Sequence, residues 1–334
     1  MRNLLRKAYH PMRRQIGGLF HGIRSRLFYW REIAKSVRHM AETGEGTEEC
    51  LKLGCLPTLV HFYSPIPDAN DLRARGVFQR KSNLAGVDMR LPQQLELLAE
   101  LGSAFGAECQ WPHEPPADPH QFYTSWNGFS FGCAAALHSL IRKHKPRRII
   151  EIGSGGSSRV ISAALMRNRA DGDIVPSYTI IDPYPTDITR SLPALTTLIN
   201  DRVEAVSPTL FQELDHNDIL FIDSGHTVRI GSDVNYLLLD IVPAVKPGVI
   251  IHVHDIPMPY EYAEVYLTNP RFRMFWTESY LLQAFLSHNQ AFEVMLAMNF
   301  LMLDHAGPFR NAWAHFQPAI HGVSHSFWFR RKPQ

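Results

Sequence analysis

The stretch that most constrains the fold is residues 148–158, which read Arg-Ile-Ile-Glu-Ile-Gly-Ser-Gly-Gly-Ser-Ser. Its isoleucines predict a short buried strand, and the glycines predict a turn into a helix over Val160–Met166. Glycine adopts backbone angles closed to other residues and lets a ligand approach the main chain. A helix that begins here directs unpaired N–H groups at that ligand. The stretch predicts a ligand-binding turn, with an ordinary strand-to-helix connection as the alternative.

The composition of the turn narrows the class of ligand. The dinucleotide fingerprint G-x-G-x-x-G needs a third glycine, where this chain has Ser158. Glu151, two residues before the first glycine, has no role in that fingerprint. A carboxylate there suits the ammonium group of S-adenosylmethionine, which nicotinamide dinucleotides lack. An NAD-dependent dehydrogenase is therefore the less favoured alternative.

More strands follow at intervals typical of a parallel sheet. Ser177–Asp182 predicts a second strand ending in an acid that can hold ribose hydroxyls. Three further strands are predicted over 202–206, 218–223 and 246–255, with a helix over 234–245. Alternating strands and helices indicate a doubly wound sheet whose ligands bind at the carboxyl ends of the strands. Glu151, Asp182, Asp223, His254 and Asp255 should gather at that edge.

Five motifs together carry a family resemblance: His61–Asp68, Glu151–Ser158, Ile181–Pro185, Asp218–His226 with Gly231–Tyr236, and Pro247–Ile256. From about His61 onward the chain resembles class I S-adenosylmethionine-dependent methyltransferases. More narrowly, it is similar to a bacterial family often described only as a methyltransferase domain. The resemblance implies an α/β, Rossmann-like sheet of seven strands that ends in an antiparallel hairpin. Gly156 stands where family members often have a bulky residue, which should loosen the turn without abolishing cofactor binding.

The resemblance also implies which residues bind S-adenosylmethionine. Asp182 would bind the ribose. In methyltransferases, the segment before the first strand often touches the methionine end of the cofactor, which makes Tyr123 and Asn127 candidates, with packing and capping as the alternative. The residues expected to cradle the methionine part are Glu151, Gly153, Ser154, Gly155 and Gly156.

The chemistry is expected after the fourth strand. Methyl transfer requires an aligned acceptor and, for a hydroxyl acceptor, removal of its proton. Asp223 and His226 are the expected catalytic residues, with the imidazole of His226 as general base. A more distant resemblance to catechol-type O-methyltransferases implies a divalent metal ion on Asp223, His254 and Asp255. Oxygen ligands suit Mg²⁺, whereas a histidine favours Mn²⁺, Fe²⁺ or Zn²⁺.

The expected function is methyl transfer from S-adenosylmethionine, to oxygen on a small molecule or a sugar. The sugar suggestion comes from resemblance to proteins that accompany glycan biosynthesis genes. Two alternatives use the same fold. One is a metal-dependent hydroxylase-like enzyme, and the other is a non-catalytic cofactor-binding scaffold at a membrane surface.

Charge is distributed unevenly along the chain. The net charge of +2 implies no general attraction to nucleic acid, but residues 1–40 hold ten Lys or Arg and one acid. Aromatic and aliphatic residues between these cations suggest a basic amphipathic helix on an anionic membrane. Packing on its own domain or on a second subunit, and a transit peptide, are the alternatives. The predicted regions are an N-terminal extension over 1–45, a cap over 46–125 and the methyltransferase domain over 126–334.

The four cysteines, Cys50, Cys55, Cys109 and Cys133, make no metal-binding pattern and are expected to be free thiols. No apolar run is long enough to span a bilayer. A cytoplasmic protein is expected, with contact at the inner face of the membrane as an option. A homo-oligomer remains open.

Overall fold

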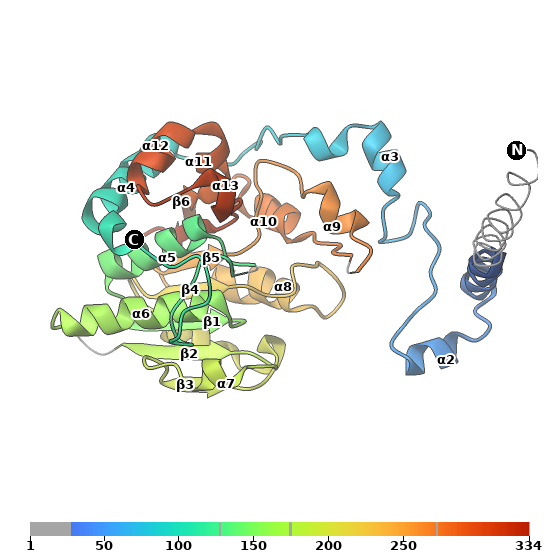
Figure 1. Ribbon diagram of the computed structural model, residues 1–334, viewed down its shortest axis with the longest axis horizontal. Coiled ribbons are helices and arrows are strands. Elements are labelled where there is room, and N and C mark those ends of the chain that lie inside the picture. The colour runs from blue at the N-terminus through green and yellow to red at the C-terminus, as the bar shows by residue number, and fades with distance from the viewer. Residues whose placement is uncertain (1–27, 127, 174–175, 272, 334) are drawn as a thin grey trace, which may run out of the picture. The chain divides into compact units, whose positions relative to one another are not determined.

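The computed structural model describes residues 28–126, 128–173, 176–271 and 273–333 (Figure 1). The chain divides into two compact units, Met1–Arg75 and Gly76–Gln334. In the described part of the first unit, residues 28–43 are helical and are followed by α2 (Thr47–Lys52) and α3 (Ala69–Ala74). The boundaries expected at residues 45 and 125 stay predictions.

The second unit is built on a seven-stranded sheet of order β3-β2-β1-β4-β5-β7-β6. The first five strands are parallel, and β7 pairs antiparallel with both β5 and β6. This arrangement confirms the predicted doubly wound sheet with a terminal hairpin. The bounds are β1 (Arg148–Ile152), β2 (Ser177–Ile181), β3 (Thr197–Ile199), β4 (Ile219–Ile222), β5 (Ile250–Val253), β6 (Phe292–Ala297) and β7 (Phe327–Arg331).

The central strands are buried on both faces because most of their residues, including all of β4, are apolar. Successive side chains of a strand point to opposite faces. Ile149 thus packs in one hydrophobic cluster with α4, α5 and α6, whereas Ile150 packs in the other with α10 and the helical run 233–244. The sheet is therefore held between two layers of helices, which fixes its carboxyl edge.

The helices follow the sequence pattern closely over this sheet. The predicted helix at 160–166 is α6 (Gly156–Ala170), and it is preceded by α4 (Leu91–Phe105) and α5 (Phe131–His144). The predicted helix at 234–245 is a run of α, π and 3-10 turns over Asp233–Ala244. The others are α7 (Asp187–Arg190), α9 (Glu264–Thr268), α10 (Glu278–Leu286), α11 (Met298–Asp304), α12 (Ala306–Ala312) and α13 (Pro318–His321).

One predicted strand was misplaced. The third strand is expected at 202–206, but β3 is Thr197–Ile199, and Val203–Ala205 forms a 3-10 turn. Val203 and Val206 both face the second hydrophobic cluster because three residues, the period of a 3-10 turn, separate them. In the terminal hairpin β6 ends at Ala297, after which Met298–Asp304 is helical.

All four cysteines are free thiols, as expected. Among the described helices, none combines the length and the apolar character needed to cross a bilayer.

Candidate functional site

The glycine turn after β1 is packed directly against the end of β4. Gly153 has a left-handed φ of 77°, and its N–H donates to the carbonyl of Ile181 at 3.0 Å. A Cβ at this position would lie 2.2 Å from the carbonyl oxygen of Asp223. Ser158, which occupies the third fingerprint position, accepts the N–H of Gly155 through its hydroxyl at 2.9 Å. The serine therefore closes the turn by a hydrogen bond that glycine could not make.

Glu151 lies fully buried on the strand that leads into this turn. Its carboxylate accepts the hydroxyl of Ser157 at 2.6 Å and the hydroxyl of Tyr178. Burial raises the pKa of Glu151 to about 7, although these hydroxyls oppose the shift. A cofactor ammonium would have to compete with both hydroxyls, so the structure gives Glu151 a supporting position beneath the turn.

Gly156 begins α6, and an aromatic side chain occupies the space beside it that a larger residue would need. A Cβ there would lie 2.8 Å from the indole of Trp126 and 3.1 Å from Phe129. Trp126 therefore occupies the space left by the expected bulky residue. Tyr123 contacts Trp126 edge to face, with ring centroids 5.3 Å apart. The indole of Trp126 thus lies between Tyr123 and the glycine turn. Asn127, the other candidate from this segment, lies outside the described residues.

Asp182 follows β2 and faces the same turn. Its carboxylate accepts the hydroxyl of Ser154 at 2.5 Å and the N–H of Tyr184 at 2.7 Å. The ring of Tyr184 is 82% exposed beside it. Asp182 is thus held in place by the protein, and an open aromatic face lies next to it.

A cavity of about 300 Å³ opens beside these residues at the carboxyl ends of β1, β2 and β4. This volume lies at the lower end of the range usual for small-molecule sites. The sequence had predicted Gly153 and Asp223 for this region, but gave no sign of Arg202, Glu204 or Arg229. The cavity is lined by Ile152, Gly153, Ile181, Pro183, Tyr184, Arg202, Val203, Glu204, Asp223, Ser224, Gly225, Arg229 and Asp233.

Asp223, His226 and Asp255 form one cluster at the far side of the turn. Each can offer a ligand atom, and these atoms lie within 4.8 Å of one another. Nε2 of His226 is 3.2 Å from Oδ1 of Asp223 and 3.6 Å from Oδ2 of Asp255. His226 and Asp255 have left-handed φ values of 55° and 54°. Such backbone angles are costly for residues with side chains and are often found at functional sites.

The pKa values of His226 and Asp255 are shifted by the charged groups around them. Burial alone would lower the pKa of His226, but hydrogen bonds to Asp223 and Glu278 raise it well above its usual range. Burial would raise the pKa of Asp255, but its histidine neighbours, His254 foremost, lower it to about 2. An imidazole must lose a proton before it can act as a general base or bind a cation. The role of His226 as general base stays a prediction, and its distances to Asp223 and Asp255 also allow it to bind a cation.

The predicted metal ligand His254 does not join this group. Its Nε2 is 2.9 Å from the carbonyl oxygen of Gly128. Since a carbonyl only accepts, Nε2 carries the proton and has no free lone pair for a metal ion. The ring also packs on Phe129, with centroids 5.1 Å apart. Among the described residues His226, and not His254, groups with Asp223 and Asp255, and the metal site itself stays a prediction.

Sequence reasoning missed two neighbours of His226. Glu278 accepts from Nδ1 of His226 at 2.9 Å, and the indole of Trp276 packs 4.6 Å from its ring. Tyr266 in turn packs 4.8 Å from Trp276. Glu278 lies 52 residues along the chain from His226, so no local motif could have linked the two.

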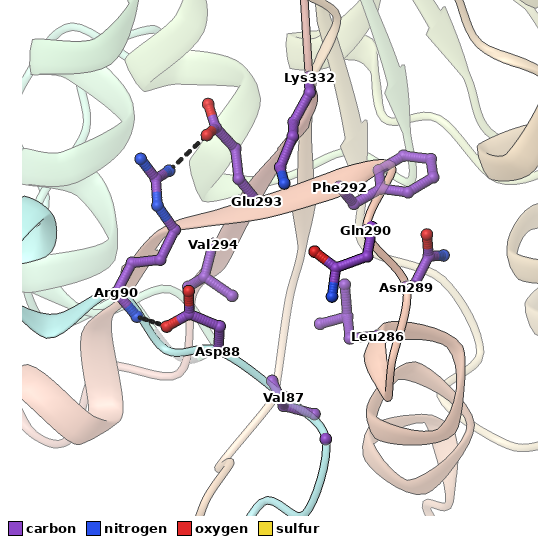
Figure 2. Close-up of a pocket in the computed structure, with 11 residues that line it drawn as sticks. Val87, Asp88, Arg90, Leu286, Asn289, Gln290, Phe292, Glu293, Val294 and Lys332 are labelled. Carbon is purple, nitrogen blue, oxygen red and sulfur yellow. Dashed lines mark hydrogen bonds and ion pairs between the residues drawn. The ribbon is translucent and has the colours of Figure 1, made fainter.

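A second cavity, of about 180 Å³, lies beside β6, the edge strand of the sheet. Figure 2 shows Arg90 directed at Glu293, with Nη1 2.7 Å from Oε2, and Lys332 next to them. Glu293 also binds Arg330. None of the predicted site residues lines this cavity, so it is separate from the candidate site.

Comparison with known proteins places the central sheet in context. A family model described as a methyltransferase domain matches residues 150–256. An uncharacterized protein of Archaeoglobus fulgidus is 31% identical over 167 residues, which cover 48% of this chain and 74% of that protein. Among solved structures, the SAH-bound methyltransferase PaMTH1 of Podospora anserina is 16% identical with a TM-score of 0.34, covering 83% of this chain and all of that one.

The buried Glu151 predicts a pH-dependent stability. Its pKa of about 7 lies above its ordinary value of 4.5, so folding favours the protonated form. The stabilisation is complete below pH 4.5 and is lost as the pH rises through 7. Glu151→Gln cannot ionise and so escapes this loss. From pH 4 to pH 8, the free energy of unfolding of the variant minus that of the unaltered protein should increase by about 3 kcal/mol.

Urea denaturation at each pH measures this difference. Glu96→Gln, an exposed change on α4, is the control and should give a difference that does not vary with pH. A constant difference for Glu151→Gln as well would show that Glu151 ionises normally in the folded protein.

Proposed function

We propose that this chain, which belongs to the class I S-adenosylmethionine-dependent methyltransferases, transfers the methyl group to an oxygen of a small molecule or a sugar. The observation that carries the proposal is that Gly153, Tyr184 and Asp223 line one cavity, and that Asp182 lies in the chain between two of its lining residues, Ile181 and Pro183. The cavity supplies room for a cofactor, and Asp223 also belongs to the cluster with His226 and Asp255.

In this proposal the cofactor lies across the carboxyl ends of β1, β2 and β4. The main chain of Gly153–Gly156 and the first N–H groups of α6 face the methionine part. Asp182 holds the ribose hydroxyls, and Tyr184 offers its exposed ring to the adenine face. Tyr123, through Trp126, supports the methionine end of the site. Glu151 keeps the turn in shape through Ser157 and Tyr178.

The acceptor would bind at Asp223, His226 and Asp255. Two carboxylates and one imidazole are a donor set that suits Mn²⁺, Fe²⁺ or Zn²⁺ better than Mg²⁺. The carboxylates of Asp223 and Asp255 beside His226 favour positive charge here, which fits a divalent cation bound by the neutral imidazole. A bound cation would lower the pKa of an acceptor hydroxyl. The residues themselves would orient that hydroxyl toward the sulfonium methyl group.

We also propose that residues 28–43 contact an anionic membrane surface. Trp30, Ile33 and Val37 share one face of this helix, and Trp30 and Val37 are 63% and 44% exposed. The cations Arg31, Lys35 and Arg38 lie along one flank of that face. Apolar burial combined with attraction to anionic lipid is the usual way in which such helices bind. Lys35 and Arg38 are paired within the helix with Glu32 and Glu42, each at 2.7 Å, so apolar burial is the larger contribution proposed here.

The cofactor proposal predicts a specific loss of affinity. Asp182→Asn keeps the shape of the side chain but removes its charge, so the Kd for S-adenosylmethionine should rise about tenfold or more. Asp187→Asn, the same change at an exposed position on α7, should leave the Kd unchanged. Calorimetric titration with S-adenosylmethionine, S-adenosylhomocysteine and NAD measures this. Binding of NAD alone would contradict the proposal.

The membrane proposal predicts loss of vesicle binding on removal of the apolar face. The double variant Trp30→Ser, Val37→Ser should bind phosphatidylserine-containing vesicles about tenfold more weakly, because two apolar side chains no longer leave water. Leu51→Ser with Leu53→Ser removes two exposed apolar residues outside this helix and should have no effect. Vesicle co-sedimentation of the full chain gives the comparison. Equal binding by both double variants would overturn the proposal. It would also be overturned if the unaltered chain bound neutral vesicles as tightly as phosphatidylserine-containing ones.

A further inference from the structure

We infer that Glu278 is a positioning residue for His226: it holds the Nδ1 proton and turns Nε2 toward Asp223 and Asp255. The inference rests on the proposed role of the Asp223, His226 and Asp255 cluster. Nothing in the sequence around Glu278 or His226 links the two residues, and the contact arises only in the folded chain.

Glu278 is the first residue of α10 and is fully buried. Its Oε2 lies 2.9 Å from Nδ1 of His226. The backbone N–H groups of Thr277 and Glu278 both donate to the carbonyl oxygen of His226, at 2.8 and 3.1 Å. The start of α10 thus holds His226 by its main chain and its side chain together. These contacts can stabilise the left-handed backbone of His226, which is unfavourable in isolation.

The direction of the hydrogen bond decides the tautomer. Glu278, as a carboxylate, accepts from Nδ1 of His226, so in the neutral ring that a cation needs the remaining proton is on Nδ1. Nε2 then points at Asp223 and Asp255, where a cation or an acceptor hydroxyl would lie. Metal-binding histidines commonly donate their second N–H to a carboxylate, which fixes the ring and makes it a better ligand.

The burial of the Glu278 carboxylate needs an explanation, because a buried charge costs free energy. A carboxylate removed from water is strongly unfavourable unless it is paired. The Oε1 atom of Glu278 has no hydrogen-bond partner among the described residues. The contact of Oε2 with His226 is therefore the compensation that the described structure offers for this burial, and a neutral apolar residue would fill the position at less cost. A role in orienting His226 accounts for the carboxylate.

The test measures Mn²⁺ binding by the full chain, with calorimetry, in Glu278→Gln and Glu278→Ala. The Mn²⁺ Kd should rise about 10- to 100-fold in Glu278→Ala and less in Glu278→Gln, whose amide oxygen can still accept from Nδ1. Glu293→Gln is the matched control, since Glu293 is a mostly buried carboxylate paired with Arg90 and Arg330 away from the site. Its Mn²⁺ affinity should equal that of the unaltered protein.

Nitrogen NMR of the His226 ring provides a second readout that needs no metal. The unaltered chain should carry a proton on Nδ1 that is hydrogen-bonded to a carboxylate, and Glu278→Ala should lose that bond. A bare Nδ1 in the unaltered chain, or equal Mn²⁺ affinity in all variants, would overturn the inference. S-adenosylmethionine affinity is measured in the same samples. Its absence in the unaltered chain would contradict the proposed function and leave the role of Glu278 to be judged by the ring protonation.

Discussion

The close approach of Gly153 to Asp223 is the contact on which the rest of the site depends. With 2.2 Å between a hypothetical Cβ and the Asp223 carbonyl, only glycine lets the turn after β1 lie against the end of β4. This contact brings the expected cofactor turn and the expected reaction cluster to the same edge of the sheet. The two layers of helices hold the strands in register, so the distance between the two halves of the site is fixed by the core.

Charge is concentrated where the parallel strands end. Asp182, Asp223 and Asp255 follow β2, β4 and β5, and Glu278 joins them from α10. His226 lies among three of these acids, and its hydrogen bonds to Asp223 and Glu278 raise its pKa. Two of the residues in its cluster have unfavourable backbone angles, which the surrounding hydrogen bonds must support. A site with this excess of negative charge suits a cationic cofactor and a divalent metal ion better than an anionic acceptor.

The sequence predicted the centre of the sheet because β1, β2, β4 and β5 each hold at least two adjacent apolar residues. It misplaced β3, since Val203 and Val206 are apolar like strand residues but face the core from a 3-10 turn. Side-chain direction was harder to predict than position. The motif around His254 and Asp255 was expected to supply two ligands, yet His254 donates to Gly128.

Long-range contacts were beyond sequence reasoning altogether. Trp126 fills the space beside Gly156, and Glu278 orients His226, although each pair is separated by dozens of residues or by an intervening strand.

The most direct test of the central claim is a crystal structure of the full chain with S-adenosylhomocysteine. The account predicts the ribose on Asp182 and the amino-acid part against Gly153–Gly156. A ligand bound elsewhere, with this cavity filled only by solvent, would contradict it.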